Sequence, residues 1–298
     1  MNVFKNHALK VRNSLNQGGD YGFISHKNMG DTIPKIIHQT YYSKELPTSI
    51  QDNVQKLKST NPSWTHKLYD DNDIDNYIAK RYPSLFPVYK QIDSSYGAAK
   101  ADFFRYLVMY DEGGVYLDIK SGANLPLDAI IKPRDKYLLS YWPDISGKKV
   151  THPGITNPCG ELQQWHIIAV KGHPYLKAVI ENVCNNIKQY NPLLHDVGLW
   201  GVLNLTGPIA YTQAITPLIN SELSTVTDSH ESLNLVYSVT ERDLLSPLLF
   251  KSHHTLFKKM HYSKKTNPII VLKGLNKIVY ILLNPIISKF TQRLRNNR

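Results

Sequence analysis

Residues 98–118 read AAKADFFRYLVMYDEGGVYLD, and this stretch decides the fold. The apolar residues that recur at three- and four-residue steps are Ala98, Ala101, Phe104, Leu107 and Val108. This periodicity predicts an α-helix over 94–111, which Gly113 and Gly114 then end. The apolar run at 115–119 predicts a short buried strand directly after the glycines.

Strand and helix patterns alternate on both sides of this stretch. Upstream, the sequence predicts strands over 33–38 and 64–69, a helix over 49–59, and a helix that the aspartates at 70, 71 and 73 begin and Arg81 ends. Downstream, it predicts strands over 138–142 and 164–170 and a helix over 174–188. Such alternation predicts an α/β fold with a mostly parallel sheet flanked by helices.

Three charged side chains stand out in the central stretch. Asp118 follows the predicted strand, and in open parallel sheets ligands bind beyond the carboxyl ends of the strands. A carboxylate there can hold a divalent cation or a sugar hydroxyl, or simply face solvent in a loop. Asp102 and Arg105 lie three residues apart on one helix face. They form either a surface ion pair or a site for phosphate or sugar oxygens.

Four motifs stand out together: Ile33-Pro-Lys-Ile-Ile-His-Gln39, Asn61-Pro62, Ala98-Ala-Lys-Ala-Asp-Phe-Phe-Arg105 and Gly113-Gly-Val-Tyr-Leu-Asp118. Together they resemble glycosyltransferase family 32, the sugar-binding-region, Asp-X-Asp-containing family that includes capsular polysaccharide and mannosyl transferases. A more distant similarity is to the large clostridial glucosylating toxins. The resemblance implies a GT-A, Rossmann-like fold, and we assign residues 31–263 to one such domain.

The resemblance also implies roles for individual residues. His38, Gln39 and Tyr41 match the first-strand motif, in which an aromatic ring usually stacks on the nucleotide base. Asp102 and Arg105 match the positions that hold the donor sugar. We therefore expect these five residues to bind the donor.

The Asp-X-Asp motif departs from the family pattern. Asp118 matches the first Asp, so it is predicted to be catalytic and to bind both donor and metal, but position 120 is Lys. The resemblance implies a divalent cofactor, Mn²⁺ or Mg²⁺, and a protonated Lys cannot ligate either. Lys120 is therefore predicted to be catalytic by placing its ammonium near the diphosphate, unless it points away and another residue supplies the ligand.

Later positions complete the predicted site. Asn204 and Thr206, beside a Gly-Pro pair, resemble a Thr-Gly-Pro loop of the family and are predicted to bind the donor. Among the histidines at 253, 254 and 261, His261 is the predicted second metal ligand, because Tyr262 and Ser263 follow it. The alternative for each histidine is a packed or exposed side chain.

The net charge of +11 is concentrated at one end of the sequence. Residues 244–298 contain eight Lys and three Arg but no Asp or Glu, so the remaining 24 basic residues balance 24 acidic ones. A basic end of this kind favours an anionic membrane surface or an acidic partner over nucleic acid, which usually meets a basic face on the body of the protein. Residues 1–30 read as a polar arm with no signal peptide, and no apolar run reaches the length of a membrane span.

The basic segment 264–298 is predicted to be an amphipathic helical tail over 269–294, opened by Pro268 and interrupted by Pro285. It either lies on a membrane surface or packs on the domain with a solvated basic face. We expect a cytoplasmic protein, peripheral on the inner face of the cytoplasmic membrane. The two cysteines, Cys159 and Cys184, are expected to be ordinary apolar residues.

The resemblance implies a retaining glycosyltransferase. It would move a hexose from a UDP- or GDP-sugar to a saccharide or lipid-linked acceptor, in capsular or lipopolysaccharide biosynthesis. The alternative is a catalytically silent sugar-nucleotide-binding or scaffolding protein at the membrane, which the loss of an acid at position 120 favours.

Overall fold

The central helix and the strand after it are joined as the sequence predicts. In the computed structural model, which describes residues 15–144, 147–155, 157–239 and 262–296, helix α5 (Gly97–Glu112) ends at Gly113 and strand β3 (Gly114–Leu117) begins one residue later. Gly113 and Gly114 have φ of +70° and +102°. A Cβ on Gly114 would lie 2.5 Å from the carbonyl oxygen of Ile36, so this turn requires glycine.

The main sheet has six strands in the order β2-β1-β3-β6-β5-β7. Its strands are β1 (Ile36–Thr40), β2 (Thr65–Tyr69), β3, β5 (Tyr137–Leu139), β6 (His166–Ala169) and β7 (Thr225–Val226). Strands β2, β1 and β3 are parallel, and so are β5 and β7, whereas β6 runs antiparallel between β3 and β5. A two-stranded sheet pairs β4 (Gly122–Ala123) with β8 (Leu235–Val236). The predicted α/β class is confirmed, with one antiparallel strand inside the sheet.

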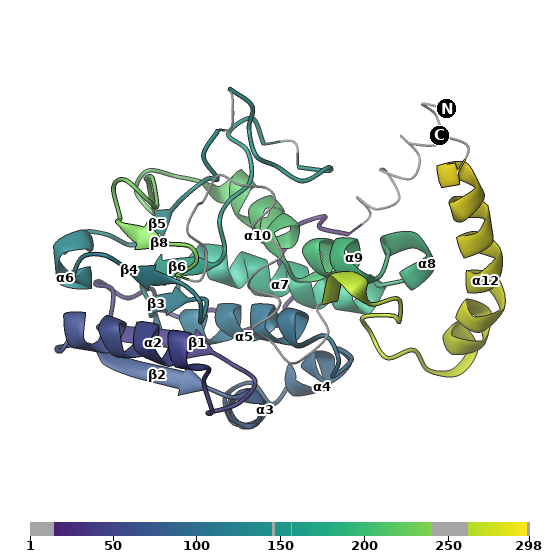
Figure 1. The fold of residues 1–298 in the computed structure, drawn as a ribbon, viewed down its shortest axis with the longest axis horizontal. Coiled ribbons are helices and arrows are strands. Elements are labelled where there is room, and N and C mark those ends of the chain that lie inside the picture. Colours follow the sequence, from purple (N-terminus) through teal and green to yellow (C-terminus); the bar gives the residue numbers. More distant parts are fainter. Residues whose placement is uncertain (1–14, 145–146, 156, 240–261, 297–298) are drawn as a thin grey trace.

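Helices cover both faces of the sheet (Figure 1). The α-helices besides α5 are α2 (Thr48–Thr60), α3 (Asp71–Arg81), α4 (Phe86–Tyr89), α6 (Leu127–Ile130), α7 (Pro174–Gln189), α8 (Pro192–His195), α9 (Gly198–Leu205), α10 (Pro208–Ile215) and α12 (Gly274–Asn296). Two 3₁₀ turns, η1 (Thr216–Leu218) and η3 (Tyr262–Lys264), complete the described elements. Asp70 begins α3 with a capping box. Its side chain accepts from the backbone N–H groups of Asn72 and Asp73, and the Asp73 side chain accepts from the backbone N–H of Asp70.

Alternation along β3 separates two hydrophobic cores. Val115 and Leu117 pack with the α2 and α6 side, whereas Tyr116 packs with α5, α7 and α10. Because side chains alternate along a strand, Asp118 continues on the Tyr116 side. The end of β3 therefore directs Asp118 toward α5.

Two segments differ from the simple sequence pattern. Leu15 and Ile24 are buried in the larger core, so the described part of the predicted polar arm, residues 15–30, packs on the domain. The helical tail begins at Gly274 rather than 269, and α12 continues through Pro285, where an interruption is predicted. A proline removes one intrahelical hydrogen bond, and on this exposed helix water can satisfy the carbonyl that loses its partner.

Candidate active site

Arg105 lies between two carboxylates. Its Nη2 atom is 3.1 Å from Oδ1 of Asp102, one turn earlier on α5, and 3.1 Å from Oδ1 of Asp118 after β3. We call Asp102, Arg105 and Asp118 the charge triad. The i,i+3 spacing that the sequence shows is therefore a buried ion pair, which the end of β3 extends by a second carboxylate.

Two neighbours fix the orientation of the Arg105 guanidinium. It lies over the Tyr116 ring, 4.7 Å from the centroid, and its Nη1 donates to the carbonyl of Gln164 at 2.9 Å. Its Nε has no hydrogen-bond partner among the residues that the structure describes. The guanidinium is thus held in one plane by a ring, a carbonyl and two carboxylates.

Asp102 is the closed end of the triad. Its side chain is buried and accepts from Thr206 Oγ1 at 3.1 Å and Gln164 Nε2 at 3.4 Å. Burial raises the pKa of Asp102 to about 6, and the nearby negative charge of Asp118 adds to this, although Arg105 acts in the opposite direction. Asp102 therefore sits where a single guanidinium does not fully compensate two acids.

Asp118 is the open end. Its side chain is 27% exposed, against 6% for Asp102 and 7% for Arg105. Its backbone is fixed, because its N–H donates to Trp165 O at 2.8 Å and its carbonyl accepts from Ser121 N at 2.7 Å and Gln39 Nε2 at 3.3 Å. A ligand approaching the triad meets a rigidly placed carboxylate.

Lys120 brings a further cation to this end of β3. It is buried, and its ammonium lies 4.0 Å from the centroid of Tyr237, a ring that packs edge-on against Trp142 and Trp165. Among the described residues, no ion pair joins Lys120 to a carboxylate. A largely buried lysine without a carboxylate partner favours an anionic ligand.

Comparison with known proteins places this geometry in a family. Residues 47–136 match the family described as "Glycosyltransferase sugar-binding region containing DXD motif". The match includes the whole charge triad. These residues are a sugar-binding region of that glycosyltransferase family. The match confirms, for residues 47–136, the glycosyltransferase family recognised from the motifs, and its description names a sugar-binding region and no capsular pathway.

The relatives support this assignment at moderate identity. Inositol phosphoceramide mannosyltransferase 2 of Schizosaccharomyces pombe is 29% identical over 53% of this chain and 40% of its own length. Inositol phosphoceramide mannosyltransferase 3 of the same yeast is 27% identical over 80% of this chain and 57% of its own length. The chain therefore spans about half the length of these relatives.

A solved structure shows the fold. The UDP-bound glycosyltransferase domain from the YGT toxin superposes with a TM-score of 0.50 at 10% identity, over 71% of this chain and 82% of that domain. At this identity the likeness concerns the fold alone. It confirms the GT-A-like architecture predicted from the motifs.

Some of the predicted donor-binding residues gather at the triad, and the others lie apart from it. Asp102, Arg105, Asp118, Gln39 and Thr206 gather at the triad through the contacts given above. His38 is fully buried, and its ring nitrogens contact Tyr69 Oη at 3.1 Å and the Gly113 carbonyl at 3.0 Å, so burial lowers its pKa to about 4. The structure thus engages both His38 nitrogens inside the protein.

Two more predicted donor residues lie near the site without joining the triad. Tyr41 is buried beside Tyr42 and Ile119, its ring 4.4 Å from that of Tyr42. Asn204 is buried and donates to the carbonyl of Trp200 at 2.8 Å. Their roles in donor binding stay predictions.

Sequence reasoning missed the residues that join the triad to the rest of the domain. Gln164, just before β6, contacts both Asp102 and Arg105. The Tyr106 hydroxyl lies within hydrogen-bond distance of two acceptors, Gln164 Oε1 and, at 2.8 Å, the Thr206 carbonyl. The only local signal was a polar pair, Gln163-Gln164, preceding an apolar strand.

The described residues do not form a complete metal site by themselves. Among residues 15–144, 147–155, 157–239 and 262–296, no three His, Cys, Asp or Glu side chains gather as a metal site would require. Asp118 provides one carboxylate, and Lys120 stands where the second Asp of the motif would be. A Mg²⁺ site of a transferase combines carboxylates with substrate phosphates and water, so Asp118 supplies at most part of one. His261, the predicted second ligand, lies outside the described residues.

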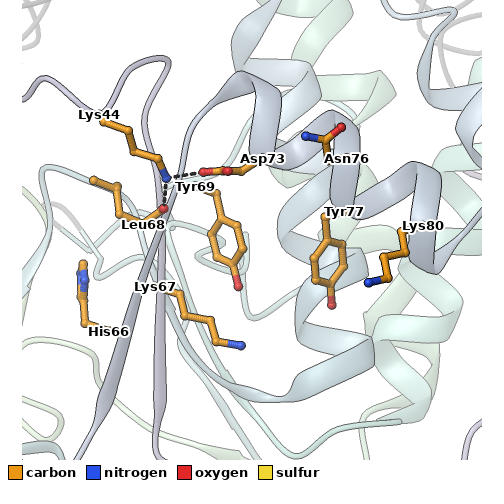
Figure 2. Close-up of a pocket in the computed structure, with 9 residues that line it drawn as sticks. All are labelled: Lys44, His66, Lys67, Leu68, Tyr69, Asp73, Asn76, Tyr77 and Lys80. Atoms are coloured by element: carbon orange, nitrogen blue, oxygen red, sulfur yellow. Dashed lines mark hydrogen bonds and ion pairs between the residues drawn. The ribbon is translucent and has the colours of Figure 1, made fainter.

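A hollow of about 550 Å³ lies at the outer edge of the sheet, between β2 and α3 (Figure 2). It is lined by Lys44, His66, Lys67, Leu68, Tyr69, Asp73, Asn76, Tyr77 and Lys80. None of these residues belongs to the triad, and two of the lysines are neutralised: Lys44 pairs with Asp73 and Lys67 with Glu112. We therefore place the site at the triad, where the uncompensated charges are.

Proposed function

We propose that this chain transfers a hexose, with mannose as the first candidate, from a UDP- or GDP-sugar to an acceptor hydroxyl. The observation that carries the proposal is the open carboxylate of Asp118, held by Arg105 against the buried Asp102. The matched sugar-binding region supports a nucleotide-sugar donor, and the names of the yeast relatives support mannose.

Asp118 is the residue of the triad that would contact the donor. Its exposed carboxylate can accept hydrogen bonds from sugar hydroxyls, because one of its oxygens faces Arg105 while the side chain remains partly open. Asp102 and Arg105 are almost fully buried, so their role is to position Asp118. Pre-positioned groups of this kind lower a barrier without reorganising during the reaction.

Lys120 would act on the leaving group. As the bond between the anomeric carbon and the phosphate oxygen breaks, negative charge grows on the diphosphate, and a nearby ammonium stabilises that charge. In a front-face displacement the acceptor oxygen bonds to the same carbon, and its proton passes to the departing phosphate oxygen. The anomeric configuration is then retained.

A lipid-linked acceptor is the more specific part of the proposal. The yeast relatives are named for inositol phosphoceramide, which is a lipid with sugar-like hydroxyl groups. We infer that this chain also uses a saccharide or lipid-linked hydroxyl, and we keep capsular or lipopolysaccharide assembly as the predicted setting. The competing proposal is a silent sugar-nucleotide-binding protein, which the Lys at position 120 favours.

A donor panel tests the proposal. Wild-type protein, Asp118→Asn and Asp128→Asn would be assayed with UDP- and GDP-hexoses for donor turnover, with binding measured separately. Asp128 is a matched control, since it is an exposed acid that contacts Lys35, Ser63 and Trp64. We expect turnover of one donor that falls about 100-fold or more in Asp118→Asn and stays unchanged in Asp128→Asn. Tight donor binding without turnover, even with lipid-linked acceptors, would establish the silent binder instead.

Metal removal tests the role of Lys120. We expect wild-type turnover to persist in a chelator, and Lys120→Gln to lower kcat about 10–100-fold while Lys120→Arg recovers part of it. Lys120→Asp, which rebuilds the Asp-X-Asp motif, should make turnover depend on added manganese. Complete loss of wild-type turnover in chelator, restored by manganese, would contradict charge replacement by Lys120.

A further inference from the structure

Helix α12 exposes a row of large apolar side chains. Leu275, Ile278 and Leu282 are 73%, 56% and 64% exposed, and Val279 beside them is 38% exposed. Residues three and four apart share one face of a helix, so these four form a continuous strip, which we call the apolar row. Single exposed apolar residues are ordinary, but a strip along one helix needs an explanation.

The apolar row faces away from the domain. Tyr280, on the opposite side of the helix, is only partly exposed, and its hydroxyl donates to the carbonyl of Thr266 at 3.3 Å. The helix contacts α8 and stands at the edge of the molecule, beyond α8 and far from the sheet (Figure 1). This is the reverse of an ordinary surface helix, whose apolar side faces the protein.

The base of α12 is fastened to the domain. Ile269 and Ile270 are buried, Asp93 N donates to the Ile269 carbonyl at 2.7 Å, and Val271 N donates to the Gln91 carbonyl at 2.8 Å. The chain therefore enters the helix from a bridge to the segment between α4 and α5. The apolar row is presented by a fixed element.

The basic charge of α12 indicates which kind of partner would bind the apolar row. The sequence of α12 contains no Asp or Glu, and Lys273 and Lys277 are exposed at its start. Residues 244–298 carry all of the +11 net charge. Lys277 lies three residues before Tyr280, so it stands on the polar side of the helix beside the apolar row, where the basic residues of an interfacial helix are found. Two copies of this basic helix would repel each other, whereas an anionic lipid surface accepts the apolar row and attracts the lysines. Among the described helices, none combines the length and the apolar character that a membrane crossing requires.

We propose that α12 docks this protein on an anionic bilayer, with the apolar row in the interface and the helix parallel to the membrane plane. The occupant is the lipid surface itself. The proposal is independent of the transferase activity, because it concerns a different part of the molecule and is tested by binding alone.

Vesicle sedimentation tests the proposal on the full chain. The vesicles are phosphatidylcholine alone and phosphatidylcholine with about 30% phosphatidylglycerol, which supplies an anionic surface. The row variant is Leu275→Ser/Ile278→Ser/Leu282→Ser. The matched control is Leu125→Ser/Leu218→Ser/Val226→Ser, which removes three apolar side chains that are 42%, 42% and 50% exposed elsewhere. Circular dichroism and thermal unfolding check that both variants fold.

We expect the wild type and the control to sediment with the anionic vesicles, and the row variant to bind them about tenfold less or weaker still. Binding of the wild type should fall on neutral vesicles and in Lys273→Gln/Lys277→Gln. Wild-type protein that stays in the supernatant with both vesicles would overturn the proposal, and so would a row variant that binds like the control. A concentration-dependent dimer in lipid-free buffer, lost in the row variant alone, would assign the row to a second copy and overturn it as well.

Discussion

Helix α5 buries an aspartate near each end, and the two are neutralised very differently. Asp111 near the C-terminal end accepts from Arg81 Nε at 2.6 Å and Tyr77 Oη at 2.8 Å, and it also pairs with Lys27. Asp102 near the N-terminal end shares the single guanidinium of Arg105 with Asp118.

The pKa values of the two aspartates move in opposite directions. Burial raises the pKa of Asp111, but its hydrogen bonds from Arg81, Lys27 and Tyr77 outweigh burial and leave the pKa below its usual value. At Asp102 burial prevails, and the pKa rises to about 6. The Asp111 cluster is electrostatically complete, whereas the triad has two acids for one cation and opens at Asp118. The comparison shows that the fully paired carboxylate of Asp111 stabilises the fold, whereas the two carboxylates that share one guanidinium lie at the candidate site.

The largest expected effect on stability comes from removing the arginine that pairs with each of the two aspartates. Arg105→Ala leaves two acids without a cation, so we expect it to lower the free energy of unfolding by about 3–5 kcal/mol. Arg81→Ala should cost about 1 kcal/mol or less, because Arg81 is half exposed and Asp111 keeps Lys27 and Tyr77. Urea unfolding measures both.

A milder variant protects this test against simple unfolding. Arg105→Lys keeps a charge but loses the planar contacts to Tyr116 and Gln164, so it should fold and still lose about 10–100-fold in donor turnover. Equal stability losses in Arg105→Ala and Arg81→Ala would remove the distinction between the two clusters.

Stability against pH should show the two aspartates with opposite signs. Unfolded Asp102 loses its proton near pH 3.8, but the folded protein holds it to about pH 6, so its stabilising contribution is complete below 3.8 and lost as pH rises to 6. A pKa rise from 3.8 to about 6 corresponds to on the order of 3 kcal/mol. Asp111, with a lowered pKa, stabilises above its usual pKa, and this stabilisation is lost as pH falls.

Unfolding measured from pH 3 to 8 separates the two contributions. Asp102→Asn should flatten the decline in stability between about pH 4 and 6, and Asp111→Asn should flatten only the acid side. Parallel curves for wild type and Asp102→Asn would show that Asp102 is not held protonated by burial.

The smallest expected effect on stability and turnover comes from removing the hydrogen bond between Thr206 and Asp102. Thr206→Val removes the Oγ1 donor to Asp102, a bond that lowers the pKa of Asp102, so the pKa should rise further. We expect a stability cost of about 1 kcal/mol and a few-fold loss of turnover at neutral pH. Thr212→Val is the matched control, since it removes a buried hydroxyl that accepts from Leu162 N. If donor turnover depended on pH in the same way in both variants, Thr206 would have no effect on the pKa of Asp102.

The sequence predicted the parts of the fold that local rules decide. The periodicity of α5, the glycine turn, β3 and the capped helix α3 all follow from residues close together in the chain. The pairing of Asp102 with Arg105 follows from their spacing on one helix. The antiparallel direction of β6 was missed, because strand direction depends on a connection whose path the local pattern does not specify.

Contacts over long sequence distances limited the prediction of the site. Thr206 reaches Asp102 across 104 residues and Gln164 reaches it across 62, and no periodicity indicates such pairs. The motif predicts His38 as a donor residue, and that role stays a prediction, but alternation along a strand did not indicate that both of its ring nitrogens would contact Tyr69 and Gly113 inside the protein. The amphipathic pattern of α12 likewise predicted an apolar side without showing that it faces outward.

The contacts of the arm with α7 determine when the arm can dock during translation. Glu181 on α7 accepts the backbone N–H groups of Tyr21, Phe23 and Ile24, and Asn16 bonds to Asn182 and Asn186 on the same helix. These partners are translated about 160–170 residues later, which at ribosomal speed means a delay of roughly 10–30 s. During that interval residues 16–24 lack these partners, so this part of the arm reaches its final position only after α7 has been made.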